Sequence, residues 1–509
     1  MGLRDRGQVG IISDMNAKDR RIKTQIETIR RLKNTIDEQN KIIAQLTQHV
    51  EQLTQQNTQL TQRIEQLERQ LAAAQKNSSN SSKPPSSDIV KKPEPEPKPK
   101  SNHPRKRKPG GQPGHAKHER PAFSADQIDD TRPYTLGKCP ECGGRLSASD
   151  KPPKVVQQVE IIAPPIEVVE HRAAAYWCRR CRKVHYAPLP PEVVKGGLLG
   201  PQLTTLVAYL KGTCHCSFST IQRFFLDVLR IKISQGQLAK VIDKSARSLR
   251  PAYEELLAAL PRQPYVRADE TGHKEKGRRW WTWCFRAELF TLFSIDPSRG
   301  SEVLYRVLGD EFNGVLGCDY FSAYRKYMRE LNLRVQFCLA HLIRDVKYLT
   351  TLSDKKTQSY GRRLLDAIRE MFGVIHRRGE LTEKTIRRRL AASREKIIRI
   401  ATQRVPATRD ARNMARRFEK HGEAFFQFIT TPGVDPTNNL AEQAIRFVVI
   451  DRRITQGTRS ARGRAWSERI WTVLATCRQT GRNVMEVLRS SLDAYWHELP
   501  SPSLLVPDT

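Results

Sequence analysis

An apolar heptad repeat near the N-terminus constrains the fold of this 509-residue chain more than any other feature of its sequence. Apolar residues occupy the a positions from Ile22 to Leu71 except at Asn57, and Leu occupies most of the d positions. Such a repeat is typical of a helix that pairs with another helix, and a lone solvated helix does not need it. β-Branched residues at a with Leu at d favour two parallel strands, whose register a buried Asn57 would fix. The sequence therefore predicts a parallel coiled coil over residues 15–75.

The net charge indicates which partner the chain binds. It carries 88 Lys and Arg against 54 Asp and Glu, a net charge of +34, and its isoelectric point is about 10.0. This excess is typical of proteins that neutralise nucleic-acid phosphates and, less often, of proteins that coat anionic membranes. No apolar run approaches the roughly 20 residues of a membrane-spanning helix, and the N-terminal residues lack an apolar signal-peptide core. We therefore expect a cytoplasmic, nucleoid-associated protein that binds DNA and no membrane.

Two CxxC pairs predict a zinc-binding module. Ten cysteines are too few for a disulfide scaffold in a chain of this length, so we interpret the paired ones as metal ligands in a reducing compartment. Each CxxC turn presents two thiolates, and two such turns complete a tetrahedral site for one Zn²⁺ ion. The alternatives are four free thiols, or a site in which His171 or His185 replaces one cysteine. The predicted zinc ligands are Cys139, Cys142, Cys178 and Cys181.

A segment rich in Ser, Pro and Lys follows the heptads over residues 76–120 and has too little hydrophobicity to fold by itself. Its basic run either contacts DNA phosphates and a narrow minor groove or belongs to a solubilising tether. The candidate DNA-binding residues in this linker are Arg105, Lys106, Arg107 and Lys108.

Helical periodicity returns over residues 197–250, in two stretches that the short sequence RIKI separates. Ser234 followed three residues later by Gln237 is typical of a capping box, so we expect the second helix to begin there. The two helices form either a DNA-binding helix-turn-helix or a plain helical pair.

Beyond Pro264 the pattern changes to strands. Three runs rich in aromatic and β-branched residues precede a helix-like run, a short apolar run, a further helix and another strand, which gives the order βββαβαβ. This order predicts a sheet of mixed direction with helical crossovers. The first and fourth strands can then lie side by side, with Asp269 closing the first and Asp319 closing the fourth.

A third acid follows a long basic helical stretch at about residues 354–430. Glu442 lies in the expected first turn of a helix that Asn439 would cap. Each acid also has an ordinary interpretation: a strand end for the first, a turn for the second, and a capping box or an i,i+4 pair with Arg446 for the third. Phosphodiester cleavage by two divalent ions, however, requires clustered carboxylates within a basic surface, which these three acids would provide.

Several motifs together resemble one transposase family. The likeness extends over nearly the whole chain, and it includes the upstream segments NSSKPPSSD and KPGGQPGH and the paired CxxC module. The order of the motifs is more specific than any single motif. The sequence resembles the DDE transposases of the insertion-sequence 66 family in the segments ADET, RRWWTWCF, GVLGCDYFSAY, FCLAHLIRD and TNNLAEQAIR.

The resemblance implies an RNase H-like catalytic core over residues 263–450, interrupted by a helical insertion at about 354–430. It implies that Asp269, Asp319 and Glu442 form a catalytic, metal-binding triad for two Mg²⁺ or Mn²⁺ ions, with the first acid bridging both ions. The implied reaction is hydrolysis of DNA at the element ends to expose a 3′-OH, followed by transesterification into target DNA. The resemblance also implies a bacterial origin and, as partners, small accessory proteins of the same element.

Further residues are expected near this site. Cys338 and His341 match a Cys-x-x-His element of related transposases and either position the target phosphate or pack, and Arg446 lies one turn after the third acid. Glu270 is expected on the opposite strand face from its neighbour because successive side chains alternate. Candidate DNA contacts in the adjacent basic hairpin are Lys274, Arg278 and Arg279.

Two other functions fit the sequence: a non-catalytic zinc-containing DNA-binding regulator, and an RNase H-like nuclease without strand transfer. The expected architecture is a multidomain α/β chain. Its segments are a tail (1–14), the coiled coil (15–75), the linker (76–120), a zinc-ribbon-like module (121–190), a helical region (191–262), the mixed-sheet core (263–450) and a basic helical segment (451–509).

The heptad pattern generates a first prediction. Asn57→Ile should raise the melting temperature of the isolated 15–75 segment and loosen its preference for dimers, because it replaces the one polar a position by an apolar side chain. Circular dichroism and analytical ultracentrifugation measure the two effects. A monomeric unmutated segment would contradict the prediction of a dimer.

Overall fold

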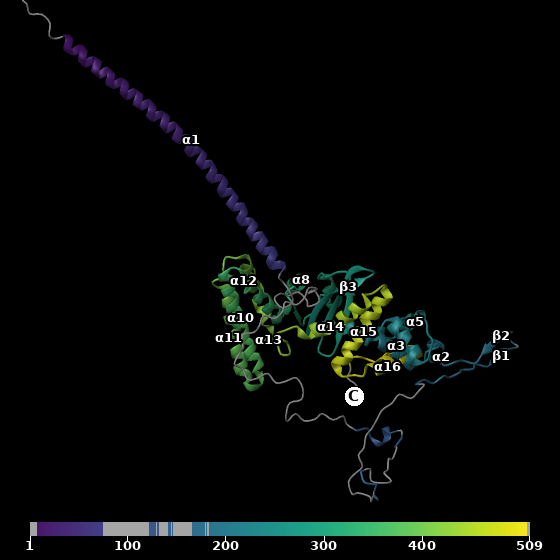
Figure 1. The fold of residues 1–509 in the computed structure, drawn as a ribbon. Helices are drawn as coiled ribbons and strands as arrows, with labels where there is room; N and C mark the ends of the chain where they lie inside the picture. Colours follow the sequence, from purple (N-terminus) through teal and green to yellow (C-terminus); the bar gives the residue numbers. More distant parts are fainter. Residues whose placement is uncertain are drawn as a thin grey trace, which may run out of the picture.

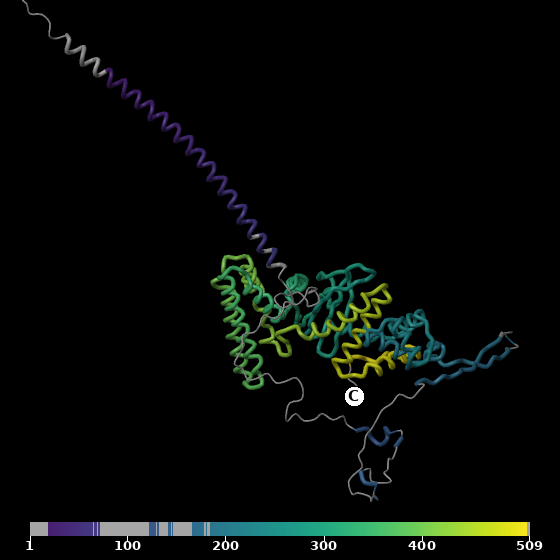
Figure 2. Tube along the Cα trace, viewed as in Figure 1, coloured from purple at the N-terminus to yellow at the C-terminus, as the bar shows by residue number. Residues whose placement is uncertain are grey.

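The computed structural model describes residues 8–74, 122–128, 130–131, 141–143, 145, 165–178, 180 and 183–505 (Figures 1 and 2). The predicted linker with its basic run at 105–108 lies outside the described residues. Cys139, Cys181 and the side chain of Cys178 also lie outside them.

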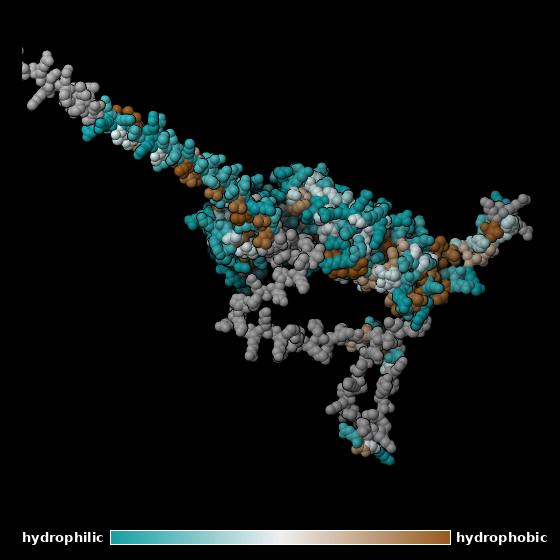
Figure 3. Space-filling view, turned by 45° about the horizontal axis from the view of Figure 1, so that its top comes forward, coloured by the Kyte–Doolittle hydropathy of each residue, from teal (hydrophilic) through white to brown (hydrophobic). Residues whose placement is uncertain are grey.

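The heptad segment lies within one long helix, α1 (Gln8–Ala74), which confirms the predicted helix. At about 1.5 Å per residue its 67 residues extend roughly 100 Å. Every side chain described in it is exposed, including the apolar a and d residues from Ile22 to Leu71, which appear as brown patches along the helix in Figure 3. Pairing of this exposed stripe with a second copy stays a prediction.

The described part of the zinc module contains a short 3₁₀ helix, η2 (Ala125–Gln127), and a two-stranded antiparallel sheet. The strands are β1 (Ala175–Cys178) and β2 (Lys183–Tyr186), with Cys178 opposite Lys183.

The chain is mostly helical from residue 191 to the start of the central sheet. Ser234 accepts the backbone N–H of Gln237, whose side chain bonds back to the Ser234 backbone, so the predicted capping box is confirmed. Whether α4 and α5 form a DNA-binding helix-turn-helix stays a prediction. The helices are α2 (Pro191–Gly196), α3 (Pro201–Gly212), α4 (Phe218–Asp227), α5 (Gln235–Ser248) and α6 (Arg250–Ala259), followed by the 3₁₀ turn η3 (Leu260–Arg262).

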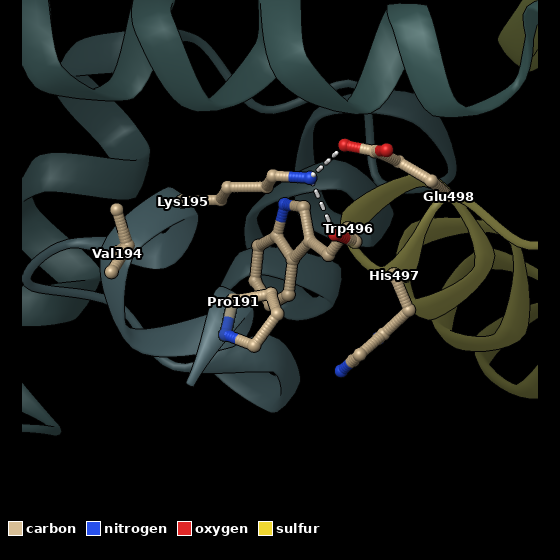
Figure 4. Close-up of a pocket in the computed structure, with 6 residues that line it drawn as sticks. All are labelled: Pro191, Val194, Lys195, Trp496, His497 and Glu498. Atoms are coloured by element: carbon tan, nitrogen blue, oxygen red, sulfur yellow. Dashed lines mark hydrogen bonds and ion pairs between the residues drawn. The ribbon is translucent and has the colours of Figure 1, made fainter. Parts of the chain in front are cut away.

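The last helix, α16 (Val484–His497), packs against α2, α3 and α5, so the C-terminal segment returns to the start of this helical region. Figure 4 shows the pocket between α2 and α16, where the Lys195 ammonium donates to the Trp496 carbonyl and pairs with Glu498 at 3.0 Å. The pocket lining contains none of the three candidate acids, and we interpret this contact as structural.

A five-stranded mixed sheet forms the centre of the chain, in the order β5-β4-β3-β6-β7. β3, β4 and β5 are antiparallel neighbours, whereas β6 runs parallel to β3 and β7 runs parallel to β6. The predicted order βββαβαβ and the predicted adjacency of the first and fourth strands are confirmed. The elements are β3 (Tyr265–Glu275), β4 (Arg278–Arg286), β5 (Thr291–Asp296), α7 (Glu302–Leu308), β6 (Val315–Cys318), α8 (Ser322–Leu331) and β7 (Arg334–Phe337).

The expectation that Asp269 closes the first strand was wrong, because β3 continues to Glu275. The polar residues after Asp269 are compatible with a strand because the C-terminal segment gives them partners. His273 hydrogen-bonds with Thr458 at 3.1 Å, and Glu275 accepts a hydrogen bond from Arg464 at 2.9 Å. The polar residues after Asp269 therefore belong to β3, and residues distant in sequence cover the polar face of this strand.

The predicted core boundary at residue 450 was also wrong, because it falls inside α14 (Asn439–Thr455), and helical cover of the sheet continues in α15 (Ala461–Thr480). α15 runs along the edge strand β5 and accepts three of its backbone N–H groups. The donor and acceptor pairs are Thr291 to Thr476 at 3.3 Å, Phe293 to Thr472 at 3.0 Å and Ile295 to Glu468 at 2.7 Å. α15 thereby satisfies the edge that β5 would otherwise leave open.

Helices fill the predicted insertion between β7 and α14. In Figure 1 they lie on the other side of the sheet from α3 and α5. The Gln336 side chain of β7 donates to the Phe425 carbonyl and accepts the Phe428 N–H, which brings the end of the insertion back to the sheet. The elements are α9 (Leu339–Leu349), α10 (Lys355–His376), η4 (Arg378–Glu380), α11 (Glu383–Thr402), α12 (Arg409–His421), η5 (Gly422–Phe425) and α13 (Gln427–Thr430).

Within the residues that the structure describes, no helix is both long enough and apolar enough to cross a bilayer.

Two glycines with similar backbone angles generate a second prediction. Gly457 (φ +89°) follows α14, and a Cβ there would overlap the Lys274 carbonyl oxygen of β3, whereas a Cβ at Gly481 (φ +74°) would meet no atom within 4 Å. Substitution by Ala should lower the free energy of unfolding by about 1 kcal/mol at either position, because the backbone there is left-handed. Gly457→Ala should lower the free energy of unfolding by more than Gly481→Ala, since only Gly457 also has a clash. Urea unfolding of both variants measures the difference, and equal losses would contradict the expected clash.

Candidate active site

The first candidate acid lies where β3 loses a neighbour. β3 pairs with β6 only from Tyr265 to Arg267, so Asp269 follows directly after the two strands part, and it lies opposite Cys284 of β4. The Asp269 carboxylate accepts the Glu270 backbone N–H at 3.0 Å. Across the described ranges it has no ion-pair partner, which leaves its charge without a compensating cation.

The second candidate acid comes directly after β6, as predicted. Asp319 accepts the backbone N–H of Phe321 at 2.9 Å, which turns the chain into α8. Burial raises the pKa of Asp319, while this hydrogen bond and the positive charges of Arg299 and Arg417 act in the opposite direction. Asp319 therefore stabilises a turn, and this structural role is compatible with a functional one.

The third candidate acid lies in the first turn of α14, as predicted, but the predicted cap was wrong by one residue. Asn438 precedes the helix, and Asn439 is its first residue. The Asn438 side chain does not cap the helix, because its amide donates to the Ala268 carbonyl of β3 at 2.7 Å. The Asn438 backbone N–H donates to the Cys338 sulfur at 3.1 Å. These two bonds fix the start of α14 beside β3 and thereby place Glu442 near the strand that carries the first acid.

The charges of the other two acids act on Asp269. Burial raises the pKa of Asp269 well above its usual range, and the negative charges of Glu270, Asp319 and Glu442 raise it further. Carboxylates that lie this close repel one another when all are ionised. The three acids come from β3, the end of β6 and α14, so the fold assembles them from segments that are far apart in sequence.

Glu270 lies on the opposite face of β3 from Asp269. Its cross-strand partner Trp283 contacts the Tyr324 ring of α8 at a centroid distance of 5.9 Å, and Glu270 itself accepts hydrogen bonds from Tyr324 and Arg299. The Glu270 side chain is 2% exposed. Burial and then the charge of Asp319 raise its pKa to about 7, whereas Arg299 and Tyr324 lower it. Glu270 thus has its own cation, unlike Asp269.

Arg299 and Tyr324 were not found from the sequence. Arg299 lies in the loop after β5 and stacks on the Phe321 ring at 4.0 Å and the Trp281 ring at 4.6 Å. A single Arg in a Ser-Arg-Gly loop and a Tyr on a helical apolar face carry no distinguishing signal. Their proximity to Glu270 depends on tertiary contacts alone.

The donor set of the three acids fits a hard divalent cation such as Mg²⁺ or Mn²⁺, which prefers carboxylate oxygens. The observation that supports this fit is the absence, within the described residues, of an ion-pair partner for Asp269, although its pKa is raised by three acidic neighbours. A divalent ion would supply the missing positive charge.

The predicted support residues Cys338 and His341 lie beside Glu442. His341 Nδ1 is 3.5 Å from the Glu442 carboxylate, and Arg344 of the same helix is 3.3 Å from it. Burial and then the charge of Arg344 lower the pKa of His341 to about 4, so this imidazole is neutral at physiological pH. Arg446 is exposed on α14.

The remaining predicted residues lie further away or outside the description. Lys274, Arg278 and Arg279 are exposed around the tip of the β3–β4 hairpin. At about 3.3 Å per residue, Lys274 lies roughly 17 Å along β3 from Asp269. Their DNA contacts stay a prediction. Among the predicted zinc ligands, the structure describes the side chain of Cys142 alone, and it is exposed.

The reassigned helix start generates a third prediction. Asn438→Ala should lower the free energy of unfolding by about 1–3 kcal/mol, because it leaves the buried Ala268 carbonyl without its donor. Asn439→Ala is the matched control, since Asn439 is exposed and should change stability by less than about 0.5 kcal/mol. Chemical denaturation of both variants measures this contrast. A larger loss at Asn439 would restore the original cap assignment.

Two curated proteins are similar to this chain. The chain is similar to the uncharacterized protein y4jD of Sinorhizobium fredii, with 28% identity over 237 residues, which are 42% of this chain and 46% of that protein. It is also similar to the uncharacterized protein y4qI of the same organism, with 22% identity over 422 residues and 75% of each chain covered. The chain thus spans about half the length of the first relative.

Three family models match different parts of the chain. A family of unknown function matches residues 22–121, and the zinc-finger binding domain of transposase IS66 matches residues 137–182, which contain all four paired cysteines. The match to the latter supports zinc binding by this module. The model described as the transposase IS66 family matches residues 196–465, which include the sheet, the insertion and all three acids. Because this match covers more than half of the sequence, the chain belongs to the IS66 family of transposases.

Proposed function

We propose that this transposase uses Asp269, Asp319 and Glu442 to cleave DNA at the ends of its element and to transfer the 3′ ends into target DNA. The observation that carries the proposal is the placement of Asp269 and Asp319 at matching positions beyond the paired residues of β3 and β6, with the helix of Glu442 bonded to β3 through Asn438 and no cation partner for Asp269 within the described residues. An acid placed only for stability would have a cation partner, as Glu270 has in Arg299 and Glu442 has in Arg344, whereas Asp269 has none within the described residues.

The same three acids would hold two Mg²⁺ or Mn²⁺ ions, which when bound activate the attacking oxygen and stabilise the leaving oxygen. The protein contributes the placement of the acids. β3 carries Asp269, the adjacent strand β6 ends directly before Asp319, and the bonds from Asn438 hold α14 and its Glu442 against β3. Partial burial around Asp269 limits access of bulk water and strengthens electrostatic interactions with bound phosphate.

Arginines beside the acids would orient the DNA backbone. Tyr320 follows Asp319 directly, and its ring contacts the guanidinium groups of Arg325 of α8 and Arg417 of α12, at 4.6 Å and 4.3 Å from the ring centroid. Arg417 also pairs with Asp345 of α9 at 2.8 Å. These contacts link the helical insertion to the acidic site. Guanidinium groups held in this way suit phosphate recognition, because less conformational entropy is lost when they bind.

The other segments would organise the DNA complex. The proposed core is RNase H-like, with its mixed sheet interrupted by the insertion. The exposed apolar stripe of α1 would pair two copies, the zinc module and the helices at 191–262 would recognise element ends, and small proteins of the same element could join the assembly. The net charge of +34 supports contacts with DNA phosphates, including those proposed for the linker and the hairpin.

The fourth prediction tests the catalytic proposal with Asp269→Asn, Asp319→Asn and Glu442→Gln. Each variant should lose Mg²⁺-dependent strand breakage and joining by on the order of 1,000-fold or more, since metal-ion stabilisation is worth several kcal/mol and about 1.4 kcal/mol is tenfold in rate. Melting temperature should hold or rise, because a repelling charge is removed. Glu423→Gln is the matched control, since Glu423 lies in the insertion and pairs with Arg394.

The assays use native element ends, Mg²⁺ and a target plasmid, with DNA binding and melting measured in parallel. Mg²⁺ should raise the melting temperature of the unmutated chain more than that of the three variants. Strand transfer that persists in Glu442→Gln would reject this acid as a ligand. Breakage without joining would favour a nuclease, and DNA binding without breakage would favour a regulator.

A further inference from the structure

A second group of metal-ligating side chains adjoins the acidic site. Cys338, His341 and Glu442 each offer one ligand atom, and these three atoms lie within 4.8 Å of one another. In a tetrahedral zinc site, neighbouring sulfur and nitrogen ligands would be about 3.5 Å apart, given Zn–S and Zn–N bonds of about 2.3 and 2.0–2.1 Å. The group therefore needs to contract by only about 1 Å to close around an ion.

The local fold explains why these residues meet. Cys338 is the N-cap of α9, and His341 lies in its first turn, so a spacing of three residues puts both on one side of the helix start. The Asn438 backbone N–H bonds the Cys338 sulfur and so joins the start of α14 to the start of α9. Glu442 lies one turn further along α14 and points back to His341.

The surroundings of Cys338 suit a metal-bound thiolate. The residue is 2% exposed, and its sulfur accepts the Asn438 backbone N–H at 3.1 Å. A backbone donor on the sulfur stabilises the negative form of the thiol. A metal ion would complete this stabilisation, because metal ligation displaces the thiol proton.

His341 is the second observation that points to a ligand. It is 9% exposed, and its Nδ1 atom has no hydrogen-bond partner within the described chain, although the Glu442 carboxylate is 3.5 Å away. A buried ring nitrogen without a partner is unfavourable, and a neutral imidazole is a common zinc ligand. Arg344 and His341 face the same oxygen of Glu442, but an ionised carboxylate has about four acceptor sites on its two oxygens, so an arginine and a metal ion can share it.

We propose that Cys338, His341 and Glu442 form a binding site for a zinc-class divalent ion, separate from the cysteine-rich module and sharing Glu442 with the Mg²⁺ site. A thiolate, an imidazole and a carboxylate select Zn²⁺ or Co²⁺ over Mg²⁺, which takes oxygen ligands. An ion held here engages Glu442 and withdraws it from Asp269 and Asp319. Zinc therefore antagonises Mg²⁺-dependent chemistry, a consequence that rests on the proposed function, whereas the site itself does not.

The fifth prediction concerns metal content. The untagged full-length chain is dialysed to equilibrium against buffered free Zn²⁺, and zinc per chain is measured by mass spectrometry. Cys338→Ser should hold one ion fewer than the unmutated chain, while its hydroxyl can still accept the Asn438 N–H. Cys214→Ser is the matched control, because Cys214 is exposed and lies outside the group, so its zinc content should not change. After Co²⁺ replaces Zn²⁺, the thiolate-to-cobalt absorption should fall in Cys338→Ser alone.

His341→Gln provides a second variant if Cys338→Ser fails to fold, as judged by circular dichroism. It should weaken binding of the additional ion by more than the roughly 10- to 100-fold that follows from disturbing an outer-shell partner. Equal zinc content in the unmutated chain and in the folded variants, at every free Zn²⁺ concentration tested, would overturn the site.

The functional consequence has its own measurement. Strand breakage at fixed Mg²⁺ is compared with and without added Zn²⁺ in the unmutated chain and in Cys338→Ser. Added Zn²⁺ should lower the rate of strand breakage in the unmutated chain, and it should lower the rate less in Cys338→Ser. Equal inhibition of both would overturn the antagonism. If neither chain breaks DNA, the proposed function fails, and the zinc-content measurement still decides the site.

Discussion

Uncompensated negative charge around Asp269 is the constraint on which the central part of the structure depends. Bringing Glu270, Asp319 and Glu442 near one partly buried carboxylate is unfavourable without a cation, and the rest of the fold must hold them there. The sheet does so by separating β3 from β6 after three paired residues, which leaves Asp269 without a strand neighbour on that side. Glu270 is neutralised by Arg299 on the opposite face, so the charge that stays available belongs to Asp269.

The sequence predicted those parts of this arrangement that local patterns determine. The heptads predicted α1, the capping box predicted the start of α5, and the alternation of strands and helices predicted a mixed sheet in which β3 and β6 are neighbours. β3 and β6 are parallel and pair as far as Arg267 and Gly317, so Asp269 and Asp319 each lie two residues beyond the last pair and at the same end of the paired segment.

The features that the sequence did not predict depend on distant partners. β3 continues past Asp269 because Thr458 and Arg464 satisfy its polar side chains, and neither residue is near it in sequence. The cap of α14 was misplaced because Asn438 uses its amide on the Ala268 carbonyl, a contact that local helix rules do not include. The family match ends at residue 465, yet the edge of β5 is satisfied by residues of α15 as far as Thr476.

The position of the insertion has a consequence for synthesis of the protein. Asp269 and Asp319 leave the ribosome first, and the helices from α9 to α13 must follow before α14 delivers Glu442. Contacts between segments so distant in sequence form late, because a long loop has to close first. A nascent or prematurely terminated chain that lacks α14 therefore contains two of the acids but no assembled cluster, and the completed chain alone carries all three. The order of the elements thus ties assembly of the acidic cluster to completion of translation through α14.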